Sequence, residues 1–297
     1  MKITLHPVRL ATAVVFGLTA LGSVSTAAAA SAQLTSQDRD VARMVSLGGS
    51  CHRCELSGRD LSGATFAGAT FVNSTLVGAN LRGAELMGSN FSNSDFSRAD
   101  MRGVEIVGAN FTDAKFTGVS LEGAEAQGAV FNRADLSRAN LSGAEMVGVS
   151  MNGANLAQAD VSGTELTGAN LANVSARGAS FSSSEMNAAN LSGGNFTGAS
   201  FREAELNSAR LAGGIFTRAD FAGAEMRRTD IRGVDLSSAR GLTQSQIARA
   251  CGDGATRLPR GMTVASCGGR MAPATPPRPP APPAPPAKRN LVGVDRD

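Results

Sequence analysis

Large apolar residues recur at every fifth position from residue 56 to residue 236, and the positions around them follow one pattern. The five-residue unit first appears at 54–58 with the sequence CELSG, and it occurs 37 times up to residue 238 without an insertion or deletion. Thirty-five of the 37 unit centres are Leu, Phe, Met, Ile or Val, and Ala occupies 22 of the 37 positions two residues before a centre. So short and regular a period predicts an architecture of stacked repeats.

Within each unit, a small residue and a large apolar residue alternate with polar residues, and many units end in Gly. This alternation places the small and large side chains on one side of an extended segment and the polar side chains on the other. An α-helix is excluded because a period of five drifts around a 3.6-residue turn, and because the many glycines would weaken it. The pattern therefore predicts a β-solenoid in which each unit forms one side of a coil and Gly or Asn allows the bend.

The decapeptide ANLRGAELMG at 79–88 resembles the pentapeptide-repeat family, whose consensus is Ala-(Asp/Asn)-Leu-x-x. The resemblance implies an all-β fold, a right-handed quadrilateral β-helix with four units per coil. The repeat region, 54–238, would then form about nine coils in a rod about 43 Å long, at about 4.8 Å per coil. Family membership implies little about function, because function depends on sites on the faces of the rod.

A second period, of twenty residues, supports the coil of four units. Four units per coil would stack residues of this spacing in one column, where unit charges about 5 Å apart repel by about 0.8 kcal/mol in water. Salt, a bound cation, or nearby arginines such as Arg102, Arg202 and Arg227 would offset that repulsion. The column is either a recognition stripe for a basic or cationic partner or a solvated remnant of repeat duplication. Its eight members, each at the outward position before a unit centre, are Glu85, Glu105, Glu125, Glu145, Glu165, Glu185, Glu205 and Glu225.

The first 32 residues have the features of a secretory signal peptide. Lys2 and Arg9 precede an apolar stretch, and small residues precede a cleavage site between Ala32 and Gln33. The apolar stretch is too short to favour a permanent anchor, so no membrane span is expected in the mature chain. We therefore expect a periplasmic or secreted protein, in a compartment where cysteines pair.

The four cysteines form two local pairs at the ends of the repeat region, Cys51 with Cys54 and Cys251 with Cys267. We expect each pair to be a disulfide that staples one end of the rod, and the longer loop makes the second worth about 3 kcal/mol. For the first pair, Glu55 excludes haem attachment, because a histidine would have to follow Cys54. A zinc site lacks ligands, since His52 is the only histidine after the predicted cleavage site. A redox dithiol at Cys51 and Cys54 remains an alternative.

The open ends of a solenoid need caps, because exposed strand edges template further pairing. A helix that begins near Ser36 is expected to form an N-terminal cap over 33–53. At the other end, Thr243 and Gln246 form a capping box, which predicts a helix that continues through Cys251 and stops before Gly252. This region, 239–271, resembles the C-terminal caps of exported family members. An end cap could also join two copies of the chain as a homodimer.

The segment 272–297 is rich in Pro and Ala and is expected to be a disordered spacer. Charge is divided unevenly along the chain: residues 54–238 contain 14 Lys and Arg against 20 Asp and Glu, whereas residues 239–297 contain 9 against 3. An acidic rod without Trp or Tyr lacks both the basic surface and the exposed aromatic platform on which nucleic-acid binding depends.

The sequence offers no recognisable catalytic motif. The repeats contain no phosphate-binding loop and no nucleophile beside a base, and we predict no cofactor or metal. The sequence therefore predicts a non-enzymatic structural or protein-interaction module of the bacterial cell envelope, with an unidentified protein or envelope component as partner. One alternative, implied by the family resemblance and disfavoured by export, is a DNA mimic that binds a type II topoisomerase. The other is an envelope thiol–disulfide protein that uses Cys51 and Cys54.

Overall fold

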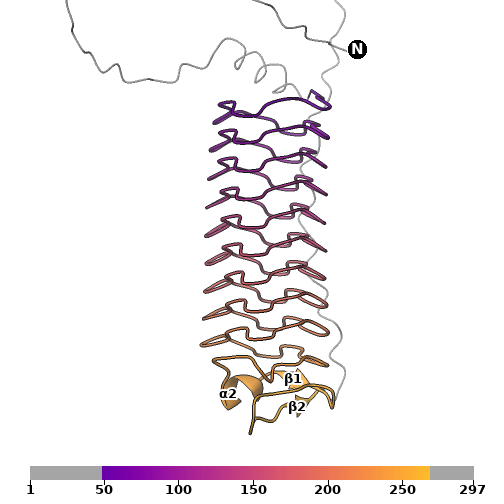
Figure 1. Ribbon diagram of the computed structural model, residues 1–297, viewed down its shortest axis with the longest axis vertical. Helices are drawn as coiled ribbons and strands as arrows, with labels where there is room; N and C mark the ends of the chain where they lie inside the picture. The colour runs from indigo at the N-terminus through magenta and orange to yellow at the C-terminus, as the bar shows by residue number, and fades with distance from the viewer. Residues whose placement is uncertain (1–48, 268–297) are drawn as a thin grey trace, which may run out of the picture. The chain divides into compact units, whose positions relative to one another are not determined.

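The structure, a computed structural model, describes residues 49–267. The chain divides into two units, Met1–Gln33 and Leu34–Asp297, and the described residues belong to the second. Figure 1 shows them as a regular stack of coils that ends in one short helix and two short strands. The predicted signal peptide, the predicted helix of the N-terminal cap and the Pro-rich tail lie outside the described residues.

The coils are joined by parallel β-bridges between residues twenty positions apart, from Ser50↔Thr70 to Asp220↔Arg240. At a typical bridge, the Leu56 N–H donates to the Thr75 carbonyl at 2.7 Å, and the Thr75 N–H donates to the Cys54 carbonyl at 2.8 Å. Twenty residues per coil correspond to four units of five, so the predicted four-unit coil and the β-helix are confirmed. Each side of a coil contributes a single bridging residue, which is why the rod contains few strands long enough to be assigned as such.

The corners between sides combine two local features of the unit. The last residue of a unit adopts a left-handed backbone conformation, as at Gly58 with a φ of 65° and at Asn73 with a φ of 59°, and Gly and Asn tolerate this region best. On three of the four sides, the Asp or Asn before a unit centre accepts a hydrogen bond from the N–H two residues later, as Asp60 does from Ser62 at 3.2 Å. Both features explain why the corner needs these residue types.

The core is a continuous stack of the unit centres, and all twelve Phe residues at centres are fully buried. Rings on the same side of successive coils stack, as Phe71 and Phe91 do with centroids 4.9 Å apart. Small inward residues leave room for the rings: a Cβ on Gly194 would lie 2.6 Å from Cε2 of Phe196. The predicted division into inward apolar and outward polar positions is therefore confirmed.

The C-terminal end is closed by helix α2 (Gln244–Ile247) and by strands β1 (Cys251–Gly252) and β2 (Ala265–Ser266), which pair in parallel. The predicted capping box between Thr243 and Gln246 is present. Gln246 also donates through Nε2 to the carbonyls of Phe221 at 2.8 Å and Ala224 at 2.9 Å, two acceptors at the open edge of the last coil. Within residues 49–267, no helix has the length and hydropathy needed to cross a bilayer.

The predicted extent of this helix was wrong, because α2 ends at Ile247 and Cys251 lies in β1. The chain leaves the helix in order to continue the ladder: Asp230 bridges Cys251, and the Ile231 N–H donates to the Cys251 carbonyl at 2.9 Å. Pairing with the last coil therefore outweighs continuation of the helix, for which nucleation is costly over so few residues.

Replacing Phe111 by Asp should unfold the rod, because Phe111 is fully buried and stacks on Phe131 with centroids 5.0 Å apart. A carboxylate at this position would be forced into an apolar core without a partner, at a cost of several kcal/mol. Thermal unfolding followed by circular dichroism measures the effect. The neighbouring outward substitution Thr112→Asp is the control and should shift the transition little; equal melting of the two variants would contradict the packing described above.

Candidate functional site

The eight predicted glutamates form one column along a single side of the rod. Each is bridged to the next, from Glu85↔Glu105 to Glu205↔Glu225, so the predicted stacking is confirmed. The column begins below Thr65, which bridges Glu85. All eight side chains are half-buried or exposed, and the structure therefore presents them to solvent as a continuous acidic line. We call this line the Glu column.

The Glu column differs from the equivalent positions on the other three sides of the coil. There, the side-chain oxygen before the unit centre accepts a hydrogen bond from the backbone N–H two residues later, as Asn110 does from Thr112 at 3.0 Å. Even Glu55, which lies on another side, accepts such a bond from Ser57 at 3.0 Å. No glutamate of the column makes this bond among the described residues, so its carboxylate is not needed to hold the corner.

Four carboxylates of the Glu column are instead hydrogen-bonded by neutral side chains on the same side of the rod. Thr65 donates to Glu85 at 3.2 Å and Gln127 donates to Glu145 at 2.7 Å. The other two pairs are Asn187 with Glu205 at 2.7 Å and Asn207 with Glu225 at 3.0 Å. The sequence analysis did not predict the amide donors. Their signal in the sequence is a spacing of eighteen residues between donor and glutamate, because each donor lies two residues after a column position and one coil before its partner.

The carboxylates of the remaining four members accept no hydrogen bond and form no ion pair with any described residue; these are Glu105, Glu125, Glu165 and Glu185. Arg102 and Arg202, which the sequence suggested as counter-charges, bind aspartates of another side: Arg102 pairs with Asp100 and Arg202 pairs with Asp220, at 3.1 Å in the second case. The third suggested arginine, Arg227, makes no ion pair within residues 49–267. The column is thus an acidic surface whose charge is only partly offset within the described rod.

The two cysteine pairs lie at disulfide distance at opposite ends of the described rod. The Cα atoms of Cys51 and Cys54 are 5.8 Å apart, and both side chains pack, partly exposed, against the first core residues. The Cα atoms of Cys251 and Cys267 are 4.9 Å apart, and this pair joins β1 to the residue that follows β2. Both separations suit a disulfide, as the predicted stapling of the ends requires.

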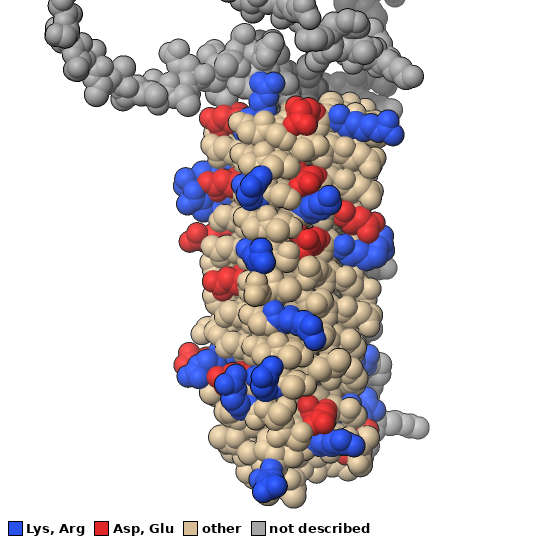
Figure 2. Space-filling model, viewed as in Figure 1, with Lys and Arg blue, Asp and Glu red and all other residues tan. Residues whose placement is uncertain are grey.

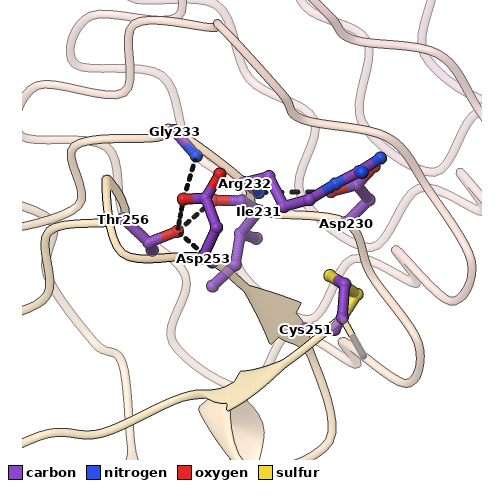
Figure 3. Close-up of a disulfide and its surroundings, with 8 residues drawn as sticks. Asp230, Ile231, Arg232, Gly233, Cys251, Asp253 and Thr256 are labelled. Atoms are coloured by element: carbon purple, nitrogen blue, oxygen red, sulfur yellow. Dashed lines mark hydrogen bonds and ion pairs between the residues drawn. A yellow bond between two sulfur atoms is a disulfide. The ribbon is translucent and has the colours of Figure 1, made fainter. Parts of the chain in front are cut away.

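One group of described side chains has a geometry that could hold a metal ion: ligand atoms of Asp230, Cys251 and Cys267 lie within 4.8 Å of one another. Figure 3 shows Asp230 in contact with Arg232, close to the sulfur pair of Cys251. Arg232 donates to both oxygens of Asp230, at 2.8 and 2.6 Å. Because the carboxylate is engaged by a guanidinium and the sulfurs are at disulfide distance, this arrangement suits the predicted staple better than a metal site.

Comparison with protein families identifies the repeat. A model described as "Pentapeptide repeat region" matches residues 50–126, and a second, "Pentapeptide repeats (8 copies)", matches overlapping segments from 114 to 237. The chain belongs to the pentapeptide-repeat family. The family resemblance inferred from the sequence is therefore confirmed, and so is the β-helical fold. No curated protein sequence matches the chain significantly.

Solved pentapeptide repeat proteins share the architecture. HetL from the cyanobacterium Nostoc sp. strain PCC 7120, a protein involved in the regulation of heterocyst differentiation, is 25% identical with a TM-score of 0.58, over 74% of this chain and 92% of its own. QnrB1, a plasmid-mediated fluoroquinolone resistance protein, is 22% identical with a TM-score of 0.49 in one trypsin-treated form, over 70% of this chain and 92% of its own. HetL shows what the chain resembles in fold, and the Glu column has to be interpreted from its own residues.

The ion pair between Asp230 and Arg232, close to Cys251 and Cys267, makes the free energy of unfolding depend on pH. The hydrogen bonds from Arg232 hold the pKa of Asp230 below its usual range. Since the folded-state pKa is depressed, the stabilising contribution of Asp230 is present above the unfolded pKa of about 3.9 and is lost as the pH falls through the folded pKa. Asp230→Asn should therefore lower the free energy of unfolding at pH 7, and the difference from the parent should shrink at more acidic pH. Urea unfolding of parent and variant, at pH 7 and at an acidic pH below the unfolded pKa, measures this difference in the free energy of unfolding.

Asp160→Asn is the matched control for this measurement, because Asp160 accepts hydrogen bonds from Ser162 but makes no ion pair with a described arginine. It should show a smaller change with pH. An Asp230→Asn variant whose loss of stability is the same at both pH values would contradict the role assigned to the carboxylate charge.

Proposed function

We propose that this protein is a non-enzymatic module of the bacterial cell envelope that binds a basic or cationic partner along its Glu column. The observation that carries the proposal is the freedom of the carboxylates: the Asp and Asn side chains on the other sides of the coil are used by the corners, whereas those of the Glu column are not. Side chains that the fold does not need are available for recognition. Salt-sensitive binding of a partner rich in Lys or Arg follows from their charge.

The spacing of the Glu column suits an extended partner. Successive glutamates are one coil apart, about 4.8 Å, while an extended chain places every second side chain about 6.6 Å apart. The two repeats are close but unequal, so an extended basic segment would approach several carboxylates without keeping strict register. Long, flexible Lys or Arg side chains accommodate such a mismatch.

Removing two adjacent charges of the Glu column tests the proposal. In the variant Glu105→Gln with Glu125→Gln, the side chains keep their shape, but the repulsion within the column falls. The variant should be at least as stable as the parent, by up to about 1 kcal/mol at low salt. It should also bind polylysine or calcium several-fold more weakly than the parent, and parental binding should weaken steeply with salt. Isothermal titration calorimetry measures the binding, and thermal unfolding measures the stability.

The control variant, Glu122→Gln with Glu203→Gln, removes the same charge at positions outside the Glu column. If both double variants lose binding equally, general charge and not the column is responsible. If the parent binds neither probe, the column is a solvated product of repeat duplication, which is the alternative considered from the sequence.

The envelope location rests on the predicted signal peptide and is tested separately. The protein purified from the producing bacterium should begin at or near Gln33, and it should contain no free thiol until a reductant exposes all four cysteines. N-terminal sequencing and a thiol assay give the two results. A chain that begins at Met1 with reduced cysteines would overturn the envelope assignment and favour the topoisomerase-binding DNA mimic. Reversible exchange confined to Cys51 and Cys54 would favour the thiol–disulfide alternative.

A further inference from the structure

Three arginines without a counter-charge gather at one corner of the last coils. Arg227 and Arg228 end the unit that contains Glu225, and the Arg228 N–H donates to the Arg249 carbonyl at 2.7 Å, which places Arg249 directly beyond Arg228 on the next level of the ladder. All three side chains are exposed. None of their guanidinium groups forms an ion pair or hydrogen bond with a described residue. We call these three residues the arginine corner.

The same corner is occupied differently higher in the rod. Glycine fills this column up to Gly168, and the small residues Ala188 and Ser208 follow, whereas Arg228 takes the same left-handed conformation with a φ of 54°. That conformation is less favourable for arginine than for glycine, so the corner itself does not call for arginine here. Arg98, an exposed arginine in the middle of the rod, is more isolated, because it has Gly78 and Gly118 in the same column one coil before and after it.

Charge separates along the rod in the same direction. Residues 49–201 contain nine Lys and Arg against fourteen Asp and Glu, whereas residues 202–267 contain ten Arg against seven acidic residues. Figure 2 shows blue side chains at the C-terminal end of the face in view. The thirty residues that follow Cys267 in the sequence add five Lys and Arg against two Asp. Positive charge is therefore concentrated in the part of the sequence that contains and follows the arginine corner.

We propose that the arginine corner docks the C-terminal end of the rod on an anionic phospholipid surface. Guanidinium groups bind phosphate oxygens through paired N–H donors, and three of them on an outward corner can engage several headgroups at once. The location decides between a surface and a polymer. Arg227 lies on the same side of the rod as the Glu column, so a nucleic acid long enough to follow that side would meet Glu205 and Glu185. A planar membrane that meets the end of the rod contacts the arginine corner and approaches only the last member of the Glu column, Glu225, whose carboxylate accepts a hydrogen bond from Asn207.

Vesicle co-sedimentation of the full chain tests this inference. The parent should bind vesicles of phosphatidylcholine that contain phosphatidylglycerol more tightly than vesicles of phosphatidylcholine alone, and the difference should disappear at high salt. The triple variant Arg227→Gln, Arg228→Gln, Arg249→Gln should lose on the order of 100-fold in affinity for the anionic vesicles, since each basic residue near such a surface contributes about fivefold. Any apolar contribution of the first 32 residues is common to both vesicles and cancels in the comparison.

The matched control is Arg98→Gln, Arg138→Gln, Arg177→Gln, which removes the same charge from exposed positions in the middle of the rod and should bind like the parent. Circular dichroism establishes that both variants fold; if the first does not, the double variant Arg227→Gln, Arg249→Gln replaces it, with an expected loss of about 25-fold. Equal binding to both vesicles, or equal losses in the two variants, would overturn the proposal. A short DNA duplex that displaces the parent from anionic vesicles, at a phosphate concentration below that of the anionic lipid, would also overturn the proposal in favour of a nucleic-acid partner.

Discussion

The twenty-residue register of the β-ladder is the constraint on which the rest of the structure depends. Because each coil hydrogen-bonds to the next with this fixed offset, every residue lies between the residues twenty positions before and after it in the sequence. An insertion of one residue would turn inward side chains outward over the rest of the rod. The register therefore converts a one-dimensional pattern into columns, and each column has its own chemistry: stacked rings at Phe71 and Phe91, or stacked carboxylates at Glu105 and Glu125.

The register is relaxed only where the rod ends. Asp230 bridges Cys251 and Asp235 bridges Arg257, so the offset grows to 21 and then 22 residues as α2 and the loop after β1 replace regular sides. The Ala224 carbonyl, which a further coil would have paired, accepts from Nε2 of Gln246 at 2.9 Å. Side chains also bond carbonyls that already accept an N–H within their own coil: Gln246 donates to Phe221 at 2.8 Å, and Thr256 donates to Ile231 at 3.0 Å. In this way the open edge is covered, and the last coil is protected from pairing with another chain.

The fold could be predicted almost completely from the sequence, because the period, the inward Phe residues and the capping box are local signals repeated without interruption. The length of α2 could not, since it depends on competition between the helix and the ladder at Cys251. At the site, the stacking of the glutamates followed from their spacing, but their partners did not. Whether Arg102 binds Asp100, two residues away, or a glutamate one side away depends on side-chain conformation, which the register leaves free. The amide donor of Gln127 was missed for the same reason.

The corners of the coil explain why one side of the rod is available for recognition. On three sides, the oxygen before the unit centre is committed to the corner, as at Asp135, which accepts from Ser137 at 3.1 Å; replacing such a residue changes the fold and the surface together. On the side of the Glu column, the corners close without this bond, so the residue at that position can vary in charge and length while the backbone remains the same. The acidic line therefore occupies the positions where surface chemistry is least coupled to folding, and a partner could be accommodated there without loss of the scaffold.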